Sequence, residues 1–143
     1  MLTYDLIVIG FGKAGKTLAA KMAAQGKKVA LIERSKAMYG GTCINIACIP
    51  TKTLLVAAEK GLAFDQVMAE KNAVTSRLNG KNYAAISGAG VDIIDAEAHF
   101  LSNKVIEITA GDEKEELTAE TIIINTGAVS VSYTHLTLPT TPY

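Results

Sequence analysis

The apolar positions near the N-terminus follow the order strand, helix, strand. Residues 4–9 (YDLIVI) are mostly apolar and β-branched without a helical period, which predicts a strand buried on both faces. Residues 14–25 place apolar side chains on one helical stripe, and Gly26 is placed to end that helix. Residues 28–32 (KVALI) predict a second buried strand. Together they form a βαβ unit, which implies a parallel sheet with a right-handed crossover.

The middle of the chain predicts a loop followed by two helices. Small residues dominate residues 35–48, which indicates a loop. Pro50 suits the start of a helix, and residues 51–63 continue the helical pattern. Residues 64–78 carry apolar side chains at helical spacing and predict another helix.

The remaining segments predict strands. Residues 91–96, 104–109 and 115–118 are β-rich and are separated by turn-forming pairs, which predicts a small antiparallel meander. Residues 121–125 (TIIIN) predict one more buried strand. The expected fold class is therefore α/β, a parallel sheet with an antiparallel meander, in one domain over residues 1–130.

The C-terminal segment, residues 131–143, differs from the rest. It is rich in threonine and proline and continues no apolar period. Reverse translation of residues 131–140 gives a string that resembles a sequencing-library adapter. We therefore expect residues 131–143 to be non-native or disordered, with a genuine flexible tail as the alternative, and we assign them no function.

Charge and hydropathy exclude several classes of function. Lys and Arg together number 14, as do Asp and Glu, and the sequence pI is about 6.7. This balance argues against nucleic acid or an anionic membrane as partner, because both need a clustered positive surface. No apolar run approaches the roughly 20 residues that span a bilayer, and the N-terminus does not resemble a secretory signal. We therefore expect a cytoplasmic protein.

A glycine-rich turn joins the first strand to the first helix. Gly10, Gly12 and Gly15 fit the pattern G-x-G-x-x-G, and Glu33 ends the next strand. In this context the pattern indicates a Rossmann-like dinucleotide site, because the glycines permit a tight turn, close approach of a pyrophosphate and helix–strand packing. Glu33 can accept hydrogen bonds from a ribose 2′-hydroxyl and repels a 2′-phosphate, which favours FAD or NAD over NADP. The alternative is a packing turn without a ligand.

Two cysteines, Cys43 and Cys48, follow in a loop that begins with glycines. Positions five apart in a regular helix have Cα atoms about 8–9 Å apart, whereas a disulfide tolerates at most about 7 Å. The pair can therefore bond only across a helix boundary or a distorted turn, which Pro50 favours. The alternatives are two buried structural cysteines or half of a metal site. We expect no metal site, because His99 and His135 lie far away in sequence.

The reactivity of this pair needs more than a helix end. A helix N-terminus stabilises a thiolate by up to ~2 kcal/mol in a partly buried site. That lowers a thiol pKa by little more than about one unit and leaves the thiol only about half ionised at neutral pH. A further cation or acceptor is therefore needed, and the sequence shows no obvious base nearby.

Residues 40–52 (GGTCINIACIPTK) closely resemble the redox-disulfide signature of the class I pyridine nucleotide–disulfide oxidoreductases. That family includes dihydrolipoamide dehydrogenase, glutathione reductase and mercuric reductase. The stretches GFGKAGKTLA and VALIERSKAMYGGTC are most similar to the mercuric-reductase-like branch linked to reactive-chlorine resistance in bacteria. The resemblance covers about residues 3–130 and is most specific at the cysteine signature.

The resemblance implies a role for each matching position. Cys43 would be the interchange thiol that meets the electron acceptor, and Cys48 the charge-transfer thiol that lies against the flavin. Lys52 would sit near flavin N5, and Glu33 would hold the adenosine ribose. The remaining implied FAD contacts are Gly10, Gly12 and Gly15 at the pyrophosphate, Gly41 and Thr42 along the cofactor, Glu97 and Ala98 at the adenine, and Thr126, Gly127 and Ala128 in a later turn.

The resemblance also implies an activity and a limit on it. Electrons would pass from NAD(P)H through FAD to the Cys43–Cys48 disulfide and on to a small-molecule or metal-ion substrate, in a homodimer. Family members are considerably longer, so the chain would be the N-terminal FAD-binding portion, without the nicotinamide and dimerisation domains or the C-terminal His-Glu pair. We expect little turnover from it alone. The alternatives are a flavin- or NAD-binding Rossmann module without cysteine redox chemistry, and a non-enzymatic binding module.

Overall fold

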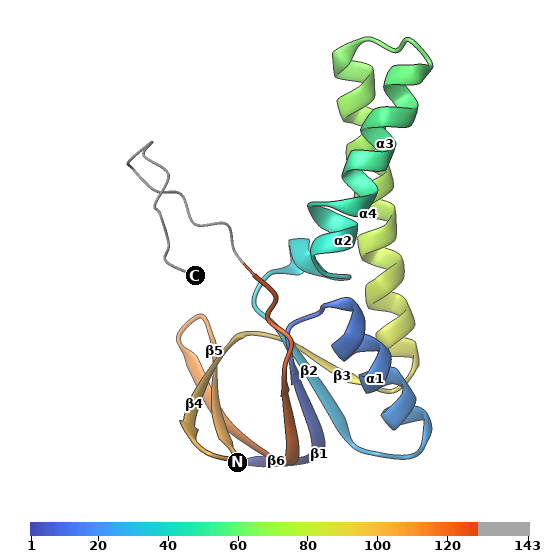
Figure 1. Ribbon diagram of the computed structural model, residues 1–143. Coiled ribbons are helices and arrows are strands. Elements are labelled where there is room, and N and C mark those ends of the chain that lie inside the picture. The colour runs from blue at the N-terminus through green and yellow to red at the C-terminus, as the bar shows by residue number, and fades with distance from the viewer. Residues whose placement is uncertain (129–143) are drawn as a thin grey trace, which may run out of the picture.

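A six-stranded mixed sheet forms the base of the computed structural model, which describes residues 1–128 (Figure 1). The strands are β1 (Leu2–Ile9), β2 (Val29–Glu33), β3 (Asp92–Asp95), β4 (Glu97–Ser102), β5 (Val105–Ala110) and β6 (Glu113–Ile124). The helices are α1 (Lys13–Ala24), η1 (Lys36–Met38), α2 (Thr42–Asn45), α3 (Cys48–Glu59) and α4 (Phe64–Gly88). Across the sheet the strand order is β3-β2-β1-β6-β5-β4. The predicted α/β class is confirmed.

The predicted βαβ unit is present at the centre of the sheet. β1 pairs in parallel with β2 on one side and with β6 on the other. Leu6, Ile7 and Val8 of β1 are all buried, as expected for a strand covered on both faces. The carboxyl ends of β1, β2 and β6 therefore meet at one edge, where ligands bind in open parallel sheets.

An antiparallel meander is present, as predicted, but its strands are β4, β5 and β6. No strand was predicted at β4, and the assignment of residues 91–96 to the meander was wrong. The strand within that segment, β3, pairs in parallel with β2, from Ala30 opposite Asp92 to Glu33 opposite Asp95. The helices between β2 and β3 form a long crossover, and a crossover returns the chain in the same direction.

Residues 115–118 and 121–125 were predicted as separate strands, and this was also wrong. Both fall almost entirely within the long strand β6. The first half of β6 pairs antiparallel with β5, and its second half pairs in parallel with β1. One strand thus joins the meander to the parallel sheet, which a pattern of local propensity does not reveal.

The helices differ from the prediction in three places. The predicted loop over residues 35–48 contains η1 and α2, and α3 begins at Cys48, before Pro50. α4 continues well beyond residue 78, to Gly88. Gly80 does not interrupt it, because a helix tolerates an internal glycine at a cost of about 1 kcal/mol.

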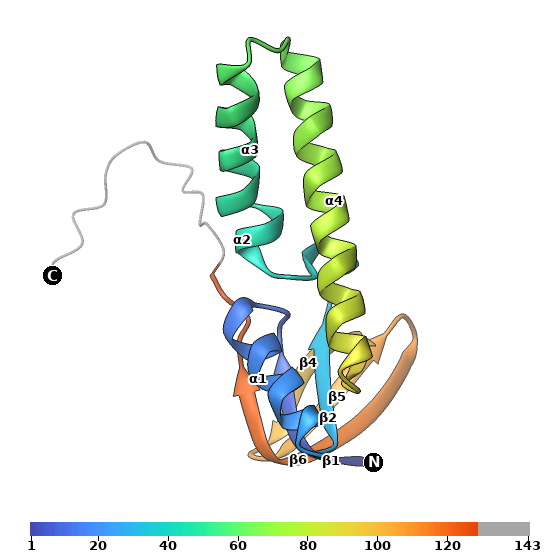
Figure 2. The ribbon, with the colours of Figure 1, turned by 90° about the vertical axis from the view of Figure 1, so that its right-hand side faces the viewer.

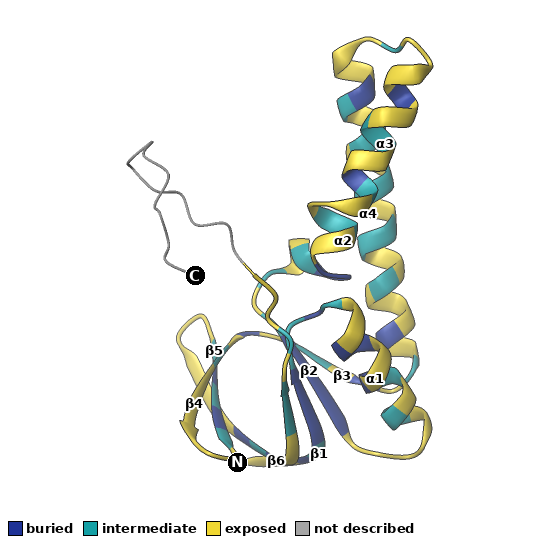
Figure 3. Cartoon of the chain, in the orientation of Figure 1, coloured by how far each residue is buried: buried dark blue, intermediate teal, exposed yellow. Residues whose placement is uncertain are grey.

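Many of the buried residues lie in the strands of the sheet (Figure 3), and two apolar clusters cover its two faces. On one face, Ile7 and Ile32 pack against Ile106 of β5 and Leu117 of β6, because the meander curls over the parallel strands. On the other face, α1 and the lower part of α4 cover β1 and β2. The upper part of the α3–α4 hairpin extends away from the sheet (Figure 2). Within residues 1–128 no helix is both long and apolar enough to cross a membrane.

Candidate functional site

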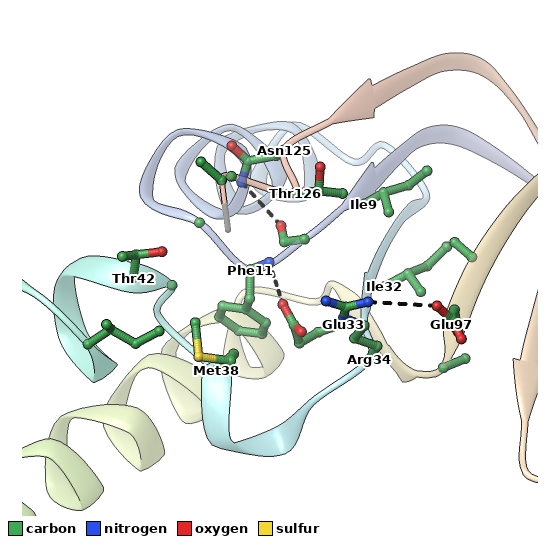
Figure 4. A pocket seen from close by; sticks show the side chains of 18 residues that line it. Ile9, Phe11, Ile32, Glu33, Arg34, Met38, Thr42, Glu97, Asn125 and Thr126 are labelled. Carbon is green, nitrogen blue, oxygen red and sulfur yellow. Dashed lines mark hydrogen bonds and ion pairs between the residues drawn. The ribbon is translucent and has the colours of Figure 1, made fainter. Parts of the chain in front are cut away.

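The glycine-rich turn after β1 is packed against Asn125, the residue that follows β6. The Asn125 backbone N–H donates to the Ile9 carbonyl oxygen at 2.8 Å, and its side-chain Nδ2 donates to the Gly10 carbonyl oxygen at 3.2 Å (Figure 4). A Cβ built on Gly12 would lie 2.7 Å from that Nδ2, and one on Gly15 would lie 2.6 Å from both Nδ2 and Val8 Cγ1. Gly15 therefore permits close helix–strand packing, as the motif predicts.

Glu33 ties the glycine turn to the end of β2. One carboxylate oxygen, Oε2, accepts a hydrogen bond from the Phe11 backbone N–H at 3.0 Å (Figure 4). The other, Oε1, accepts from the Ser35 N–H at 3.0 Å. Each oxygen keeps a free lone pair, so the carboxylate can still accept a hydrogen bond from a ligand hydroxyl.

A cleft of about 540 Å³ opens at the carboxyl ends of β1, β2 and β6 (Figure 4). It runs from the glycine turn past Glu33 to β4, and in the other direction to α2. Ten of the predicted site residues line it: Gly10, Gly12, Glu33, Gly41, Thr42, Glu97, Ala98, Thr126, Gly127 and Ala128. The predicted site residues Gly15, Cys43, Cys48 and Lys52 do not line the cleft, although Thr42 and Ile46, beside and between the cysteines, do.

The turn before α2 lies directly on the glycine turn. Gly41 has a φ of 75°, which favours glycine, and a Cβ at this position would lie 2.8 Å from the Gly12 Cα atom. The Thr126–Gly127 segment also approaches α2, since a Cβ on Gly127 would be 4.0 Å from Thr42 Oγ1. Three segments that are distant in sequence thus converge at the same end of the cleft.

Tyr39 lies in the segment between β2 and α3 that carries the two cysteines (residues 35–48, called the cysteine loop below), and it contacts the glycine turn, α4 and β3. Its ring lies 5.1 Å from the ring of Phe11 and 4.9 Å from that of Tyr83 on α4. Its hydroxyl donates a hydrogen bond to Asp95 of β3, which also pairs with Lys36 at 3.5 Å. Burial, followed by this hydrogen bond, raises the pKa of Tyr39 well above its ordinary value. The loop is therefore held at both the glycine turn and the sheet edge.

Replacing Tyr39 with phenylalanine should lower the free energy of unfolding by about 1–2 kcal/mol, because the variant leaves Asp95 without its hydrogen-bond donor. Urea denaturation followed by circular dichroism measures this change. Tyr83→Phe is the control, since the Tyr83 hydroxyl is exposed and donates no hydrogen bond to residues 1–128. Equal losses of stability in the two variants would show that the Tyr39–Asp95 bond contributes nothing.

The two cysteines flank a break between two helices, as the disulfide geometry requires. Cys43 is the second residue of α2, and Cys48 is the first residue of α3. Asn45, between them, donates to the carbonyl oxygens of Tyr39 at 2.9 Å and Gly41 at 3.0 Å. Both cysteines are exposed thiols.

The charges around Cys43 act in opposite directions. A hydrogen bond with the Cys48 thiol is the largest influence and raises the pKa of Cys43, with smaller contributions from burial and from the charge of Cys48. The positive charge of Lys52, one turn along α3 from Cys48, lowers it. The predicted residues Cys43, Cys48 and Lys52 are thus brought together, outside the cleft.

Sequence reasoning missed Asn125, Tyr39 and a buried lysine, Lys16. Asn125 could have been noticed, because it is the polar residue that directly follows a buried strand. Lys16 lies in a helix that looks amphipathic, and nothing in the sequence marks it as buried. Within residues 1–128, no three His, Cys, Asp or Glu side chains are arranged to hold a metal ion. The predictions for residues 131–143, including His135, lie outside the described residues.

The sequence of the chain is similar to parts of longer known proteins. The chain is 46% identical over 132 residues to the probable pyridine nucleotide-disulfide oxidoreductase RclA of Escherichia coli K12, covering 92% of this chain and 30% of that protein. It is 34% identical to a mercuric reductase of Staphylococcus aureus, covering 87% of this chain and 25% of the relative. The chain therefore spans about 30% or less of the length of these relatives.

A solved structure shares the fold. The copper(II) complex of the HOCl-induced flavoprotein disulfide reductase RclA from Escherichia coli superposes with a TM-score of 0.91 at 45% identity, covering 99% of this chain and 32% of that one. The family model described as pyridine nucleotide-disulphide oxidoreductase matches residues 4–139. The chain belongs to the pyridine nucleotide-disulphide oxidoreductase family.

Proposed function

We propose that this chain is the FAD-binding part of an NAD(P)H-dependent disulfide oxidoreductase, with Cys43 and Cys48 as its redox pair. One observation carries the proposal: Cys43 and Cys48 flank the break between α2 and α3, and their neighbours Thr42 and Ile46 line a glycine-rich cleft. Family membership supports the reaction class, because the relatives include a disulfide oxidoreductase and a mercuric reductase.

The cleft fits the nucleotide part of FAD. Its volume of about 540 Å³ is typical of small-molecule sites. It also opens at the N-terminus of α1, where unpaired N–H groups attract phosphates. The contact between Gly41 and Gly12 leaves no room for a Cβ, so only glycine preserves this cradle. When bound, FAD supplies electron transfer between NAD(P)H and the sulfur pair.

We assign the FAD contacts as follows. Glu33 accepts a hydrogen bond from the adenosine ribose, and Ala98 lies at the adenine end. Lys52 lies towards the flavin end, on the same side as Cys48. The residues that would line the pyrophosphate and the rest of the cofactor are Gly10, Gly12, Gly41, Thr42, Thr126, Gly127 and Ala128. Gly15 would contribute through the close packing of α1 against β1.

The sulfur chemistry follows from the reduced pair. The Cys43 thiolate attacks one sulfur of a disulfide acceptor, forming a mixed disulfide and releasing the first thiolate product, which takes up a proton. The Cys48 thiolate then attacks the Cys43 sulfur, so the Cys43–Cys48 disulfide forms and the second product leaves and is protonated. Two electrons and two protons thus pass from the cysteine pair to the acceptor.

The acceptor class we favour is thiophilic. Adjacent thiols are soft ligands, which suit copper and mercuric ions as well as disulfides. A copper acceptor would take one electron on each of two copper(II) ions, while the pair forms its disulfide and releases two protons. The related reductase was solved as a copper(II) complex, which supports this range.

We further propose that the whole protein works as a homodimer in the reducing cytoplasm. The chain spans about 30% of the RclA relative, so the NAD(P)H site and the dimer contacts are assigned to the rest of the protein. Apart from the proposed redox pair the chain has no cysteine for a structural disulfide, which is typical of a compartment that keeps thiols reduced.

The proposed redox pair is tested by mapping the disulfide. The purified chain is oxidised with diamide, alkylated, and analysed by mass spectrometry. Because the chain has only two cysteines, an intramolecular bond must protect both from alkylation, and Cys43→Ser or Cys48→Ser must each abolish it. Recovery of two alkylatable thiols, or of intermolecular disulfides only, would rule out the proposed redox role.

A further inference from the structure

Lys16 is the buried charged side chain of residues 1–128, with 8% of its surface exposed. It lies near the N-terminal end of α1, whose first turn contains no acidic residue. That end of the helix already carries a partial positive charge, to which Lys13 adds another. Burying an ammonium group in such a place costs free energy unless an anion compensates it.

No carboxylate within residues 1–128 provides that compensation. The ion pairs of this part of the chain involve other lysines and one arginine. Burial, followed by the charge of Lys13, lowers the pKa of Lys16, whereas the negative charge of a Cys43 thiolate acts in the opposite direction. Cys43 is the one anionic group among these influences on Lys16, and its contribution is smaller than those of burial and Lys13.

The backbone explains why the two side chains are neighbours. Gly12 precedes α1 and Gly41 precedes α2, and these two glycines are in contact. Helical side chains lean towards the N-terminus of their helix, so Lys16 leans towards this junction. Cys43 lies in the first turn of α2, which stands directly over the start of α1 in both views (Figures 1 and 2).

A bound pyrophosphate is the other anion whose charge the Lys16 ammonium group could compensate. Its phosphates would lie in the cleft, against the glycine turn. Lys16 is not among the residues that line the cleft, although Gly12 and Gly41 are. The position of Lys16 therefore favours the cysteine over the cofactor.

We propose that Lys16 is a positioning residue for Cys43, and that its ammonium group favours the thiolate, which is the form that attacks an acceptor. The proposal rests on the proposed redox role of the cysteines. Lys16 would be the additional cation that a cysteine at a helix N-terminus needs in order to ionise fully near neutral pH. Lys52 lowers the pKa of the same thiol from α3, while the hydrogen bond with Cys48 raises it.

The test measures how fast Cys43 of the reduced chain reacts with iodoacetamide as a function of pH, with fragment-ion mass spectrometry separating it from Cys48. Lys16→Met should move the midpoint to higher pH and slow the reaction near neutral pH by about 3- to 10-fold. Lys16→Arg should keep the rate within about twofold of the parent, because it keeps the charge. Lys21→Met, at an exposed position on the same helix, should have no effect. A folded Lys16→Met chain with an unchanged midpoint would overturn the proposal.

A measurement on the unmodified chain covers the case in which Lys16→Met does not fold. If the ammonium favours the thiolate, then the thiolate must favour the ammonium equally. The NMR signal of the Lys16 ε-carbon, assigned with the Lys16→Arg variant, should therefore shift over the pH range in which Cys43 ionises. Alkylation of Cys43 should remove that shift, and a signal indifferent to Cys43 would contradict the proposal.

The two proposals fail in different ways. A chain that never forms the Cys43–Cys48 disulfide would refute the redox function, whatever Lys16 does. A chain that forms the disulfide normally, with a Cys43 midpoint that ignores Lys16, would refute only the role of Lys16.

Discussion

Replacement of Gly41 by alanine should lower the free energy of unfolding by about 2–5 kcal/mol and abolish FAD retention. Two costs add at this position. The φ of 75° is unfavourable for any residue with a Cβ, and that Cβ would lie 2.8 Å from the Gly12 Cα atom. Neither backbone segment can move away cheaply, because one belongs to the cysteine loop and the other to the glycine turn. Urea denaturation and flavin absorbance after gel filtration measure the two effects.

Gly61→Ala is the matched control for Gly41→Ala. Gly61 has nearly the same backbone conformation, with a φ of 70°, but a Cβ there would meet nothing within 4 Å. It should therefore cost only the conformational term of about 1–2 kcal/mol and leave flavin binding unchanged. If Gly41→Ala and Gly61→Ala lower stability and flavin binding equally, the contact between Gly41 and Gly12 is not needed to form the cleft.

Asn125→Asp should weaken FAD binding at least about tenfold, or ~1.4 kcal/mol, although the two side chains are almost the same size. The substitution removes the donor to the Gly10 carbonyl oxygen and leaves that oxygen facing a carboxylate. It also places a negative charge where we expect the pyrophosphate. The free energy of unfolding should fall by about 1–3 kcal/mol from the lost hydrogen bond.

The effect of Asn125→Asp should depend on pH in a defined direction. The new carboxyl is disfavoured in its charged form, so the loss should be largest above its pKa and should shrink as the pH falls through it. Isothermal titration of FAD at several pH values measures this dependence. Asn103→Asp, in the β4–β5 turn, provides a control that should bind FAD normally. Equal affinity of Asn125→Asp and the parent chain would show that the pyrophosphate does not lie at this turn.

Local pattern was sufficient for the part of the fold that forms the cleft. A βαβ unit brings Gly10, Gly12 and Glu33 to one edge through nearest neighbours in sequence, so their convergence could be predicted. The break between α2 and α3 at the cysteines could also be expected from the hypothesis of a disulfide, because two cysteines five positions apart in a regular helix are too distant to bond.

The rest depends on contacts between segments that are far apart in the chain. The position of β3 beside β2 follows from a long helical crossover. The strand β6 pairs with β5 in the meander and with β1 in the parallel sheet. Asn125 reaches Gly10 across more than a hundred residues, and Tyr39 reaches Asp95 across the same crossover. Periodicity and propensity describe single segments and contain no information about contacts between segments that are distant in sequence.

The most direct test of the account is the visible absorption spectrum of the FAD-loaded chain during anaerobic reduction with dithiothreitol. A Cys48 thiolate lying against the flavin should produce a long-wavelength charge-transfer absorption. This absorption should disappear in Cys48→Ser and persist in Cys43→Ser. A chain that binds no FAD, or one whose flavin spectrum is the same with serine at residue 48, would contradict the proposal that the cysteine pair lies beside the cofactor.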